Sequence, residues 1–404
     1  MQHSLATYFE QYLRRDSIFL DKSVLEGNYT PEELLHRNEQ MESIAQMLAP
    51  ALRLEKPSNL FIYGKTGTGK SVTVQYTTEQ LLAVAKEKGI PLKRIYINCK
   101  MKREADTEYR LLAFFARELG ADVPATGLPT DEVYRTFVSK IDVKEQLILL
   151  VLDEVDELLK RSDDSVLYNL TRLNTSLKRA QISLIGITND ITFTNHLDPR
   201  VRSSLGEEEI IFPTYNALQI QDILTQRTAK AFSTGVIQPG VIEKCAAFAA
   251  RDHGDARRAI ELLRVAGEIA ERNRLKEVTI EHLDEAEGKI ERDRMLDMVR
   301  YQPKQFQAVV YAILTLSERD SRSLLSTGEV YNHYQKLCGP SNLRPLTQRR
   351  VSDIIAELDM LGLINVKIIS KGRYGRTREI TASVPQDTAR NVKKLIAQNL
   401  DLPA

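Results

Sequence analysis

The sequence predicts an α/β fold: a parallel sheet covered by helices, then an all-helical domain, then a smaller domain of helices and a β-hairpin. Two observations predict this order. Short apolar runs alternate with helix-length segments over residues 59–212, and strand-like runs stop after Pro213. Near the C-terminus, three helical patterns precede two short strand patterns. Strand–helix alternation is typical of parallel sheets, because each crossover between parallel strands takes up a helix's length of chain.

The predicted strands of the sheet are short and rich in Ile, Val and Leu, as expected for strands that are buried on both faces. They cover residues 60–63, 95–97, 147–152, 182–187 and 210–212. Between the second and third strands, residues 100–141 form a longer stretch with a turn-rich centre, which indicates an insertion.

Residues 214–294 show helical patterns only. Asn216 is a good helix N-cap, and Pro239 suits the first turn of a helix. The predicted helices cover residues 216–232, 239–252, 255–274 and 279–294. A charged stretch at 291–294 leads into Pro303, which marks the end of a linker. We therefore expect domains at residues 1–213, 214–294 and 295–404.

The composition indicates a folded protein of two or three domains with one basic end. The chain has 404 residues, of which 42% are hydrophobic and 27% charged, and a formal net charge of +1. The charge is uneven, because residues 301–404 hold 15 Lys and Arg against 9 Asp and Glu. A basic end on a mildly acidic body suggests contact with a polyanion; a basic but solvated surface is the alternative.

Cysteine usage and hydropathy exclude several classes of protein. Cys99, Cys245 and Cys338 are far apart, and no Cys or His pair has zinc-ligand spacing. An odd, sparse cysteine count fits a reducing compartment. The longest apolar run, 147–152, is too short for a membrane span, and the N-terminus lacks a secretion pattern. We expect a cytoplasmic protein with no membrane partner.

Residues 64–71, GKTGTGKS, match the P-loop pattern in full. Glycines let the backbone curl so that successive N–H groups point at phosphate oxygens, and the following helix presents the positive end of its dipole. We expect Lys70 to reach the β- and γ-phosphates and Ser71 to ligate Mg²⁺. A glycine turn without a ligand is the alternative. The residues expected around the phosphates are Gly67, Thr68, Gly69, Lys70, Ser71 and Val72.

Two acids, Asp153 and Glu154, follow the most apolar predicted strand, at the end where open α/β sheets bind ligands. We expect Asp153 to hold the Mg²⁺ shell and Glu154 to act as general base on the attacking water. Asn189 follows the next strand and could orient that water, or it could simply start a turn. Asp156 and Glu157 fit a helix N-terminus, where the dipole favours acids.

The basic end contains a predicted helix-turn-helix reader and a hairpin. Residues 347–361 form a helix with one buried face and a basic N-terminal end, as in proteins that read the major groove. The hairpin has a basic tip at 371–376, whose glycines permit a tight turn and whose cations and tyrosine can lie along phosphates or in a minor groove. An exposed hairpin without a partner is the alternative. The side chains expected to contact DNA are Gln348, Arg349, Arg350, Lys371, Arg373, Tyr374, Arg376 and Arg378.

Together these motifs resemble the AAA+ ATPases, and more narrowly the archaeal replication initiators related to the eukaryotic origin recognition complex and cell-division-cycle loader. The resemblance covers nearly the whole chain and is carried by residues 29–37, 61–71, 197–206, 254–259 and 372–377. It implies a AAA+ P-loop parallel-sheet domain with an α-helical lid, followed by a C-terminal winged-helix domain. It also makes residues 100–141 the initiator-specific insertion, which can touch the minor-groove side of DNA.

The resemblance also assigns roles to single residues. Asn189 becomes the first sensor, and Arg257 becomes the second sensor, which can grip the γ-phosphate from the lid. The remaining nucleotide contacts that it implies are His36, Arg37, Tyr215 and Arg227.

Arg200 and Arg202 are candidate arginine fingers, which would act on the nucleotide of a neighbouring molecule. Many eukaryotic relatives and clamp loaders carry a Ser-Arg pair in this segment, whereas this chain has Ser203 and Ser204. The departure leaves open which arginine acts in trans, and it is compatible with a protein that works alone on DNA with little turnover.

The function implied by the resemblance is an ATP-dependent DNA replication initiator that binds origin duplex DNA and helps recruit or load the replicative MCM helicase. ATP, ADP and Mg²⁺ would be its cofactors, and a weak ATPase its switch. Paralogous initiators or copies of itself would be partners on the DNA, and it would be associated with the nucleoid. Two alternatives share the fold: a winged-helix transcription regulator with bound nucleotide, and a clamp-loader-like motor.

Overall fold

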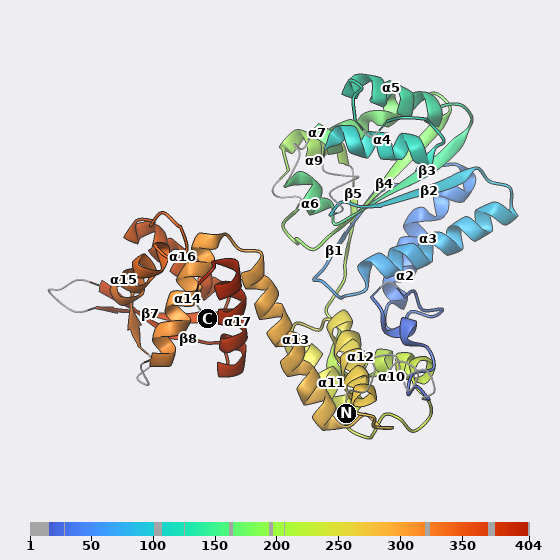
Figure 1. Ribbon diagram of the computed structural model, residues 1–404. Helices are drawn as coiled ribbons and strands as arrows, with labels where there is room; N and C mark the ends of the chain where they lie inside the picture. The colour runs from blue at the N-terminus through green and yellow to red at the C-terminus, as the bar shows by residue number, and fades with distance from the viewer. Residues whose placement is uncertain are drawn as a thin grey trace, which may run out of the picture. The chain divides into compact units, whose positions relative to one another are not determined.

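The computed structural model describes residues 16–27, 29–100, 107–124, 126–160, 165–193, 197–205, 207–319, 324–370 and 376–402. The chain divides into two compact units, residues 1–283 and 284–404. The first contains the large sheet and most of the helices, and the second contains further helices with a small sheet (Figure 1). In the described ranges, no helix is long and apolar enough to cross a lipid bilayer.

The large sheet is parallel throughout, as the sequence predicts, with the strand order β2-β3-β4-β1-β5. The last strand begins before the predicted 210–212 run because it lies at the edge of the sheet, where exposed acids such as Glu208 are tolerated. The strands are β1 (Asn59–Tyr63), β2 (Leu92–Asn98), β3 (Gln146–Asp153), β4 (Ala180–Thr188) and β5 (Glu207–Ile211).

Both faces of the sheet are buried, because side chains alternate along each strand between two hydrophobic clusters. Leu60 and Ile62 of β1 pack on one side against α2 and α3, whereas Phe61 packs on the other side with the helices that follow β2 and β3 (Figure 1). The helices of this domain are α2 (Asn38–Leu48), α3 (Lys70–Glu87), α4 (Glu108–Glu118), α5 (Thr130–Ile141), α6 (Val155–Leu159), α7 (Ser165–Arg172) and α9 (Pro199–Leu205). The predicted insertion contains α4 and α5, which pack on each other through Phe115 and Phe137.

A helical lid follows the sheet. Asn216 begins its first helix in a capping box with Gln219, as the sequence predicts. The helix predicted over 279–294 crosses the boundary between the two units and continues to Arg300, because a run of charged residues does not stop a helix, whereas Pro303 restricts the residue before it. The helices are α10 (Ala217–Ala231), α11 (Val241–Arg251), α12 (Ala256–Arg272) and α13 (Ile280–Arg300).

The N-terminal segment, residues 16–36, packs on the lid helices. The main-chain N–H of Leu20 donates to the carbonyl of Ala231 at 2.8 Å, and the rings of Phe19 and Phe232 lie 4.7 Å apart. A short 3₁₀ turn, η1 (Lys22–Leu25), contacts α10 and α12. This segment therefore belongs with the lid, although it precedes the sheet in the sequence.

The second unit has the predicted winged-helix arrangement, in which three helices precede a β-hairpin. Its antiparallel sheet has the order β6-β8-β7. The sequence reading did not include β6, which is too short to show a pattern, or α17, whose buried face carries Ala389, Val392 and Ile396 at helical spacing. The elements are α14 (Lys304–Arg319), β6 (Leu325–Ser326), α15 (Thr327–Cys338), α16 (Gln348–Met360), β7 (Ile364–Ser370), β8 (Arg376–Ala382) and α17 (Gln386–Asn399).

We expect Gly186→Ala to destabilise the sheet domain. Gly186 of β4 lies opposite Phe61 of β1, and a Cβ there would stand 2.5 Å from the Phe61 ring. Because Phe61 is buried in the core, the free energy of unfolding should fall by about 1–3 kcal/mol, measured by urea denaturation. Gly288→Ala in α13 is the control, since no atom lies within 4 Å of its added Cβ. Equal losses in both variants would contradict this account of the core.

Candidate nucleotide site

The P-loop connects β1 to α3, whose first residue is Lys70. Gly67 and Gly69 have φ angles of 74° and 87°, in the left-handed region that glycine enters without steric cost. The first amides of α3 have no acceptor within the helix, and the positive end of the helix dipole lies beside them. The loop therefore has the geometry of an anion site.

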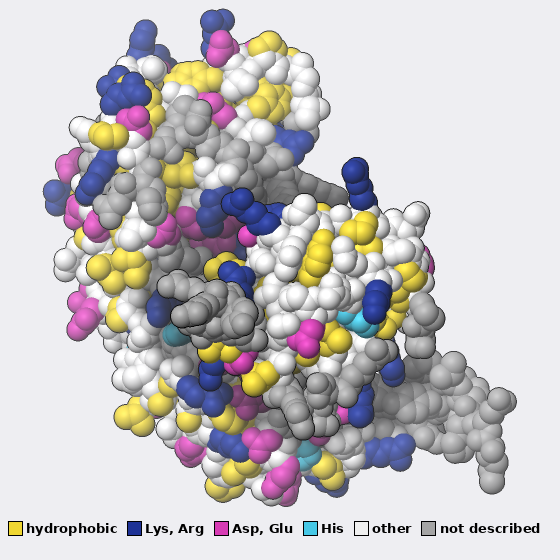
Figure 2. Space-filling view, turned by 90° about the vertical axis from the view of Figure 1, so that its left-hand side faces the viewer, with side chains coloured by type: hydrophobic (Ala, Val, Ile, Leu, Met, Phe, Trp, Pro, Cys, Tyr) yellow, Lys and Arg dark blue, Asp and Glu magenta, His cyan; other side chains and the backbone are white. Residues whose placement is uncertain are grey.

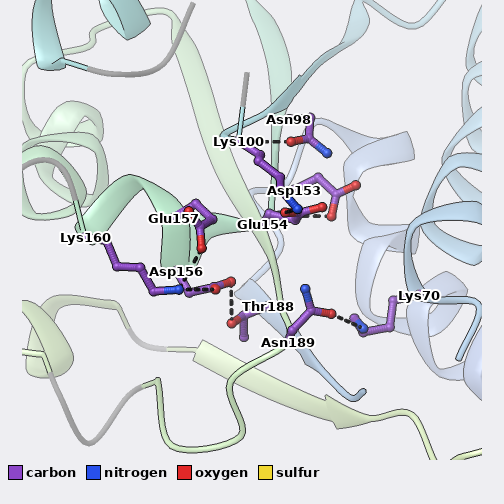
Figure 3. A network of polar contacts seen from close by, with 10 residues as sticks. All are labelled: Lys70, Asn98, Lys100, Asp153, Glu154, Asp156, Glu157, Lys160, Thr188 and Asn189. Atoms are coloured by element: carbon purple, nitrogen blue, oxygen red, sulfur yellow. Dashed lines mark hydrogen bonds and ion pairs between the residues drawn. The ribbon is translucent and has the colours of Figure 1, made fainter. Parts of the chain in front are cut away.

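The Lys70 side chain is folded back over this loop. Its Nζ donates to the carbonyls of Gly64 (2.7 Å) and Lys65 (2.8 Å) and to Oδ1 of Asn189 (2.9 Å), as Figure 3 shows for the last contact. Burial lowers the pKa of Lys70 to about 8, while the nearby charge of Asp153 opposes that shift. The ammonium is thus held at the loop by neutral acceptors that phosphate oxygens can replace.

Asp153 ends β3 and is almost fully buried. Its Oδ1 accepts the main-chain N–H of Glu154 at 3.0 Å, and its Oδ2 accepts the hydroxyl of Tyr96. Burial, and then the charge of Asp153, raises the pKa of Tyr96, so the hydroxyl stays protonated as a donor. Both oxygens of the carboxylate are therefore fixed in orientation at the carboxyl end of the sheet.

Glu154 turns the chain from β3 into α6 with a left-handed backbone (φ 53°). This conformation costs free energy in a residue other than glycine, and such strain tends to collect at functional sites. The Glu154 carboxylate lies 3.5 Å from Nζ of Lys100, whose own N–H donates to the side chain of Asn98 at 2.9 Å (Figure 3).

A second group of contacts ties β4 to α6. The hydroxyl of Thr188 donates to Asp156 at 2.9 Å, and Lys160 forms ion pairs with Asp156 (3.6 Å) and Glu157 (2.6 Å), as Figure 3 shows. These two acids thus have partners within the fold beside the site.

The lid reaches the phosphate site through the N-terminus of α12. Asp255 caps this helix by accepting the N–H groups of Arg257 (2.9 Å) and Arg258 (3.3 Å). The N–H of Ala256 donates to the carbonyl of Gly67 in the P-loop at 3.3 Å. The helix therefore begins against the P-loop, and Arg257 in its first turn lines the site.

Two cavities adjoin the P-loop and share several lining residues. The smaller one, about 100 Å³, is lined by polar groups that include Lys70, Glu154 and Asn189. The larger one, about 930 Å³, extends between the N-terminal segment and the lid. The smaller, polar cavity suits phosphates, and the larger cavity, with its apolar walls, suits a purine. A nucleoside triphosphate requires both. Apolar walls of the larger cavity come from Leu25, Leu34, Ile223 and Ile260.

Most of the predicted catalytic and nucleotide-binding residues line one of these two cavities. They are Gly67, Thr68, Gly69, Lys70, Ser71, Val72, Asp153, Glu154, Asn189, Tyr215, Arg227 and Arg257. Three others do not line either cavity, namely His36, Arg37 and Arg200.

His36 contacts the lid, where its Nε2 lies 2.8 Å from Oδ2 of Asp222 in α10. Arg37 lies behind the P-loop and donates to the carbonyl of Thr68 at 2.9 Å. Arg200 is exposed at the start of α9, and its guanidinium pairs with the carboxylate of Asp198 (3.1 and 3.2 Å).

Arg227 lines the larger cavity only, which places it at the apolar end of the site rather than beside the phosphates. Its Nη1 donates to the carbonyl of Val24 at 2.9 Å, and its guanidinium lies 4.4 Å from the centre of the Tyr29 ring. Burial lowers its pKa. The side chain thus fastens the N-terminal segment to α10.

The residues present fit a Mg²⁺ ion that is held mainly by the nucleotide. Ser71 and Asp153 line both cavities, and Mg²⁺ usually combines one or two protein ligands with phosphate oxygens and water. Across the described residues, no three or more His, Cys, Asp or Glu side chains form a metal site by themselves. The donor set therefore suits a metal that arrives with the phosphates.

In the second unit, α16 starts after Thr347, whose hydroxyl accepts the N–H of Arg350, and its first turn is exposed. Arg378 of β8 donates to the carbonyl of Ser352 at 2.8 Å, which ties the hairpin to α16. The predicted DNA contacts in the exposed first turn are Gln348, Arg349 and Arg350. Outside the described residues lie Lys371, Arg373 and Tyr374, and so does the side chain of Arg376.

The face of the molecule drawn in Figure 2 carries basic and acidic side chains intermixed rather than one uniform basic field.

Two residues of β2 that sequence reasoning missed belong to the site. Tyr96 and Asn98 line the larger cavity, and Tyr96 holds Asp153. Asn98 lies opposite Asp153 because β2 and β3 are neighbours in register. The sequence shows that the strand ends in a polar residue, Asn98, two residues after Tyr96. This pattern indicates a role beside Asp153 only once β2 and β3 are known to be neighbours.

Fold and site together define a P-loop ATPase of the AAA+ class with a helical lid and a winged-helix domain. Family models match the chain in the same order. Residues 53–192 match the AAA domain, residues 221–288 the Cdc6 AAA+ ATPase-type lid domain, and residues 297–392 the CDC6 C-terminal winged helix domain.

Relatives identify the family more closely. The ORC1-type DNA replication protein of Pyrococcus furiosus is 53% identical over 97% of this chain and 93% of its own length. The ORC1-type DNA replication protein 1 of Methanosarcina mazei is 52% identical over 96% of this chain and 93% of its own. The Aeropyrum pernix ORC1 protein, solved in complex with DNA, matches with a TM-score of 0.81 at 43% identity, over 95% of this chain and 98% of that one. The chain belongs to the family of ORC1-type DNA replication proteins.

We expect Tyr96→Phe to weaken Mg²⁺-dependent ATP binding by about tenfold, because Asp153 loses the donor that orients it. Calorimetric titration with and without Mg²⁺ separates this effect from a general loss of affinity, since metal-free binding should not change. Tyr63→Phe is the matched control, because the Tyr63 hydroxyl donates to Glu209 at the sheet edge. An equal loss with and without the metal would rule out this role for Tyr96.

Proposed function

We propose that this chain is an ATP-dependent DNA replication initiator that binds origin duplex DNA and helps recruit or load the replicative MCM helicase. The observation that carries the proposal is the pairing of a complete P-loop site with a winged-helix unit in a chain of the ORC1-type family. The solved complex of the Aeropyrum pernix relative with DNA supports DNA as a ligand of this chain as well. Such a protein would act at the nucleoid, in the cytoplasm.

The proposed ATP site divides the work among its side chains. Lys70 would exchange its carbonyl and Asn189 acceptors for the β- and γ-phosphate oxygens. Ser71 and Asp153 would hold Mg²⁺, whose chemistry there would be to offset the negative charge of the phosphates. Asn189, freed from Lys70, would orient the attacking water, and Glu154 would accept its proton.

Two contacts support a weak, switch-like ATPase rather than a motor. Glu154 pairs with Lys100 at 3.5 Å through one carboxylate oxygen, and this contact would compete with the attacking water for that oxygen. The candidate finger Arg200 pairs with its own neighbour Asp198, and Arg202 is exposed beside it on α9. A molecule alone would therefore turn over slowly, and a paralogous initiator or a second copy on the DNA would change that rate.

Nucleotide and DNA would be coupled through the lid. Arg257 would contact the γ-phosphate and hold α12 closed against the P-loop, and loss of that phosphate would release it. On the DNA side, the first turn of α16 would enter a major groove and the β7–β8 hairpin would follow the backbone. The α4–α5 insertion would touch the minor-groove side.

We expect the double variant Arg373→Gln, Arg376→Gln to bind duplex DNA more weakly and with a shallower dependence on salt. Each lost phosphate contact should reduce the slope of log affinity against log salt by about 0.9, so the pair should reduce it by roughly two. Fluorescence anisotropy across a salt series measures the slope. Arg274→Gln with Lys276→Gln, both exposed after α12, is the control. An unchanged slope would remove the hairpin from the DNA contacts.

Footprinting on the protein's own genome, with and without Mg·ATP, tests the proposed function. Protection at repeats in one or two origin regions supports an initiator, whereas protection scattered over many promoters indicates the alternative transcription regulator. Lys70→Ala should lose ATP binding and with it any ATP-dependent change in the footprint. Normal ATP binding by that variant would contradict the P-loop assignment.

A further inference from the structure

Arg37 is buried more completely than its charge would suggest. The residue is 2% exposed and ranks among the largest fully buried side chains. Its donors go to main-chain carbonyls, with Nε on Thr68 (2.9 Å), Nη1 on His36 (3.1 Å) and Nη2 on Pro213 (2.7 Å). Among the described residues it has no carboxylate partner. Since burying an unpaired cation is costly, the position needs a physical explanation.

Part of that cost is offset by aromatic rings. The Arg37 guanidinium lies 3.8 Å from the centre of the Tyr215 ring and 5.5 Å from that of Phe212. Burial nonetheless lowers the pKa of Arg37. The same guanidinium therefore joins three parts of the fold: the segment before α2, the P-loop, and the connection at Pro213 between β5 and the lid.

The contact with Thr68 sets the direction of an amide. A trans peptide is planar, so the carbonyl of Thr68 and the N–H of Gly69 point in opposite directions. Arg37, which donates to that carbonyl, lines neither cavity, whereas Thr68 and Gly69 both line the smaller cavity. The Gly69 N–H is thereby aimed away from Arg37, and among the described residues it has no hydrogen-bond partner.

A second contact acts on the neighbouring peptide from the lid. The N–H of Ala256 donates to the carbonyl of Gly67, which by the same geometry directs the N–H of Thr68. The lid can approach this closely only because Gly67 has no side chain, since a Cβ there would stand 1.7 Å from Oδ1 of Asp255. The carbonyls of two successive P-loop peptides thus accept hydrogen bonds from other parts of the fold, one from Arg37 and one from Ala256 of the lid.

We propose that Arg37 is a positioning residue for the phosphate cradle: it fixes the Thr68–Gly69 peptide so that the Gly69 amide faces the phosphates, in concert with Ala256 of the lid. The inference rests on the proposed nucleotide function and deepens it. Because Arg37 also donates to the carbonyl of Pro213, at the start of the segment that leads into the lid, it connects that segment to the cradle, beside the direct contact of Ala256 with Gly67.

The test compares ligands that do and do not use the cradle. In Arg37→Met, the dissociation constants of ATP and of inorganic tripolyphosphate should rise by about 10- to 100-fold, as expected when a charged hydrogen bond that orders the site is lost. The dissociation constant of AMP, which lacks the β- and γ-phosphates, should change by less than about threefold on the same reasoning. Arg37→Lys keeps one cationic donor and should recover part of the ATP affinity.

Arg94→Met is the matched control. Arg94 is a partly buried arginine of the sheet domain, and its guanidinium donates to the carbonyl of Gln75 and the hydroxyl of Thr78 on α3, outside the P-loop. It should lower the melting temperature without changing the ratio of AMP to ATP affinity.

Several results would overturn the proposal. They are an equal loss of ATP and AMP affinity in Arg37→Met, unchanged ATP affinity, or a change in the affinity ratio in Arg94→Met as large as that in Arg37→Met. If Arg37→Met does not fold, Arg37→Lys decides alone, since an ATP-to-AMP ratio equal to that of the wild type contradicts the proposal. Failure of the wild-type protein to bind ATP or tripolyphosphate would instead refute the proposed nucleotide function.

Discussion

The site depends on one constraint: a short run of main-chain amides must stay aimed at a single point while remaining unpaired. A loop of glycines cannot hold such an arrangement by itself, because the freedom that permits the turn also permits many others. The protein holds the loop from outside. Arg37 and Ala256 donate to its carbonyls from other segments, and Lys70, at the end of the motif, donates to the carbonyl of Gly64.

The two cavities are lined by two parts of the first unit, the parallel sheet and the lid with the N-terminal segment. Asp153, Glu154 and Asn189 follow or end strands of the sheet and would face the phosphates, whereas the N-terminal segment and the lid line the larger cavity, which would take the base. Since the N-terminal segment packs on α10 and α12, it belongs with the lid. A bound nucleotide would therefore contact both the sheet and the lid. Loss of its γ-phosphate would remove a contact of Arg257 and could shift the connection at Pro213. We regard this division as the physical basis of the proposed switch.

Much of this site could be predicted from the sequence because its chemistry is local. The P-loop lies within eight consecutive residues, and Asp153 and Glu154 are recognisable as acids that directly follow an apolar strand pattern. The role of Tyr96 could not be predicted, because it requires knowing that β2 and β3 are neighbours. The contacts of Arg37 and Arg227 could not be predicted from the sequence either. Both arginines lie near the nucleotide site, but they donate to the carbonyls of Pro213 and Val24, which are distant in the sequence. The predicted end of α13 at residue 294 was wrong, because Pro303 is the nearest residue that physically prevents the helix from continuing.

The central claim is that the nucleotide state of this chain controls delivery of the helicase to origin DNA. The most direct measurement is the amount of MCM helicase retained on immobilised origin duplex by the protein loaded with ATP or with ADP, at equal occupancy of the protein on the DNA. Glu154→Gln, which removes the proposed general base, would hold the ATP state during the measurement. The account predicts clearly more helicase with ATP than with ADP. Equal retention in the two states would contradict it and leave the nucleotide with a structural role only.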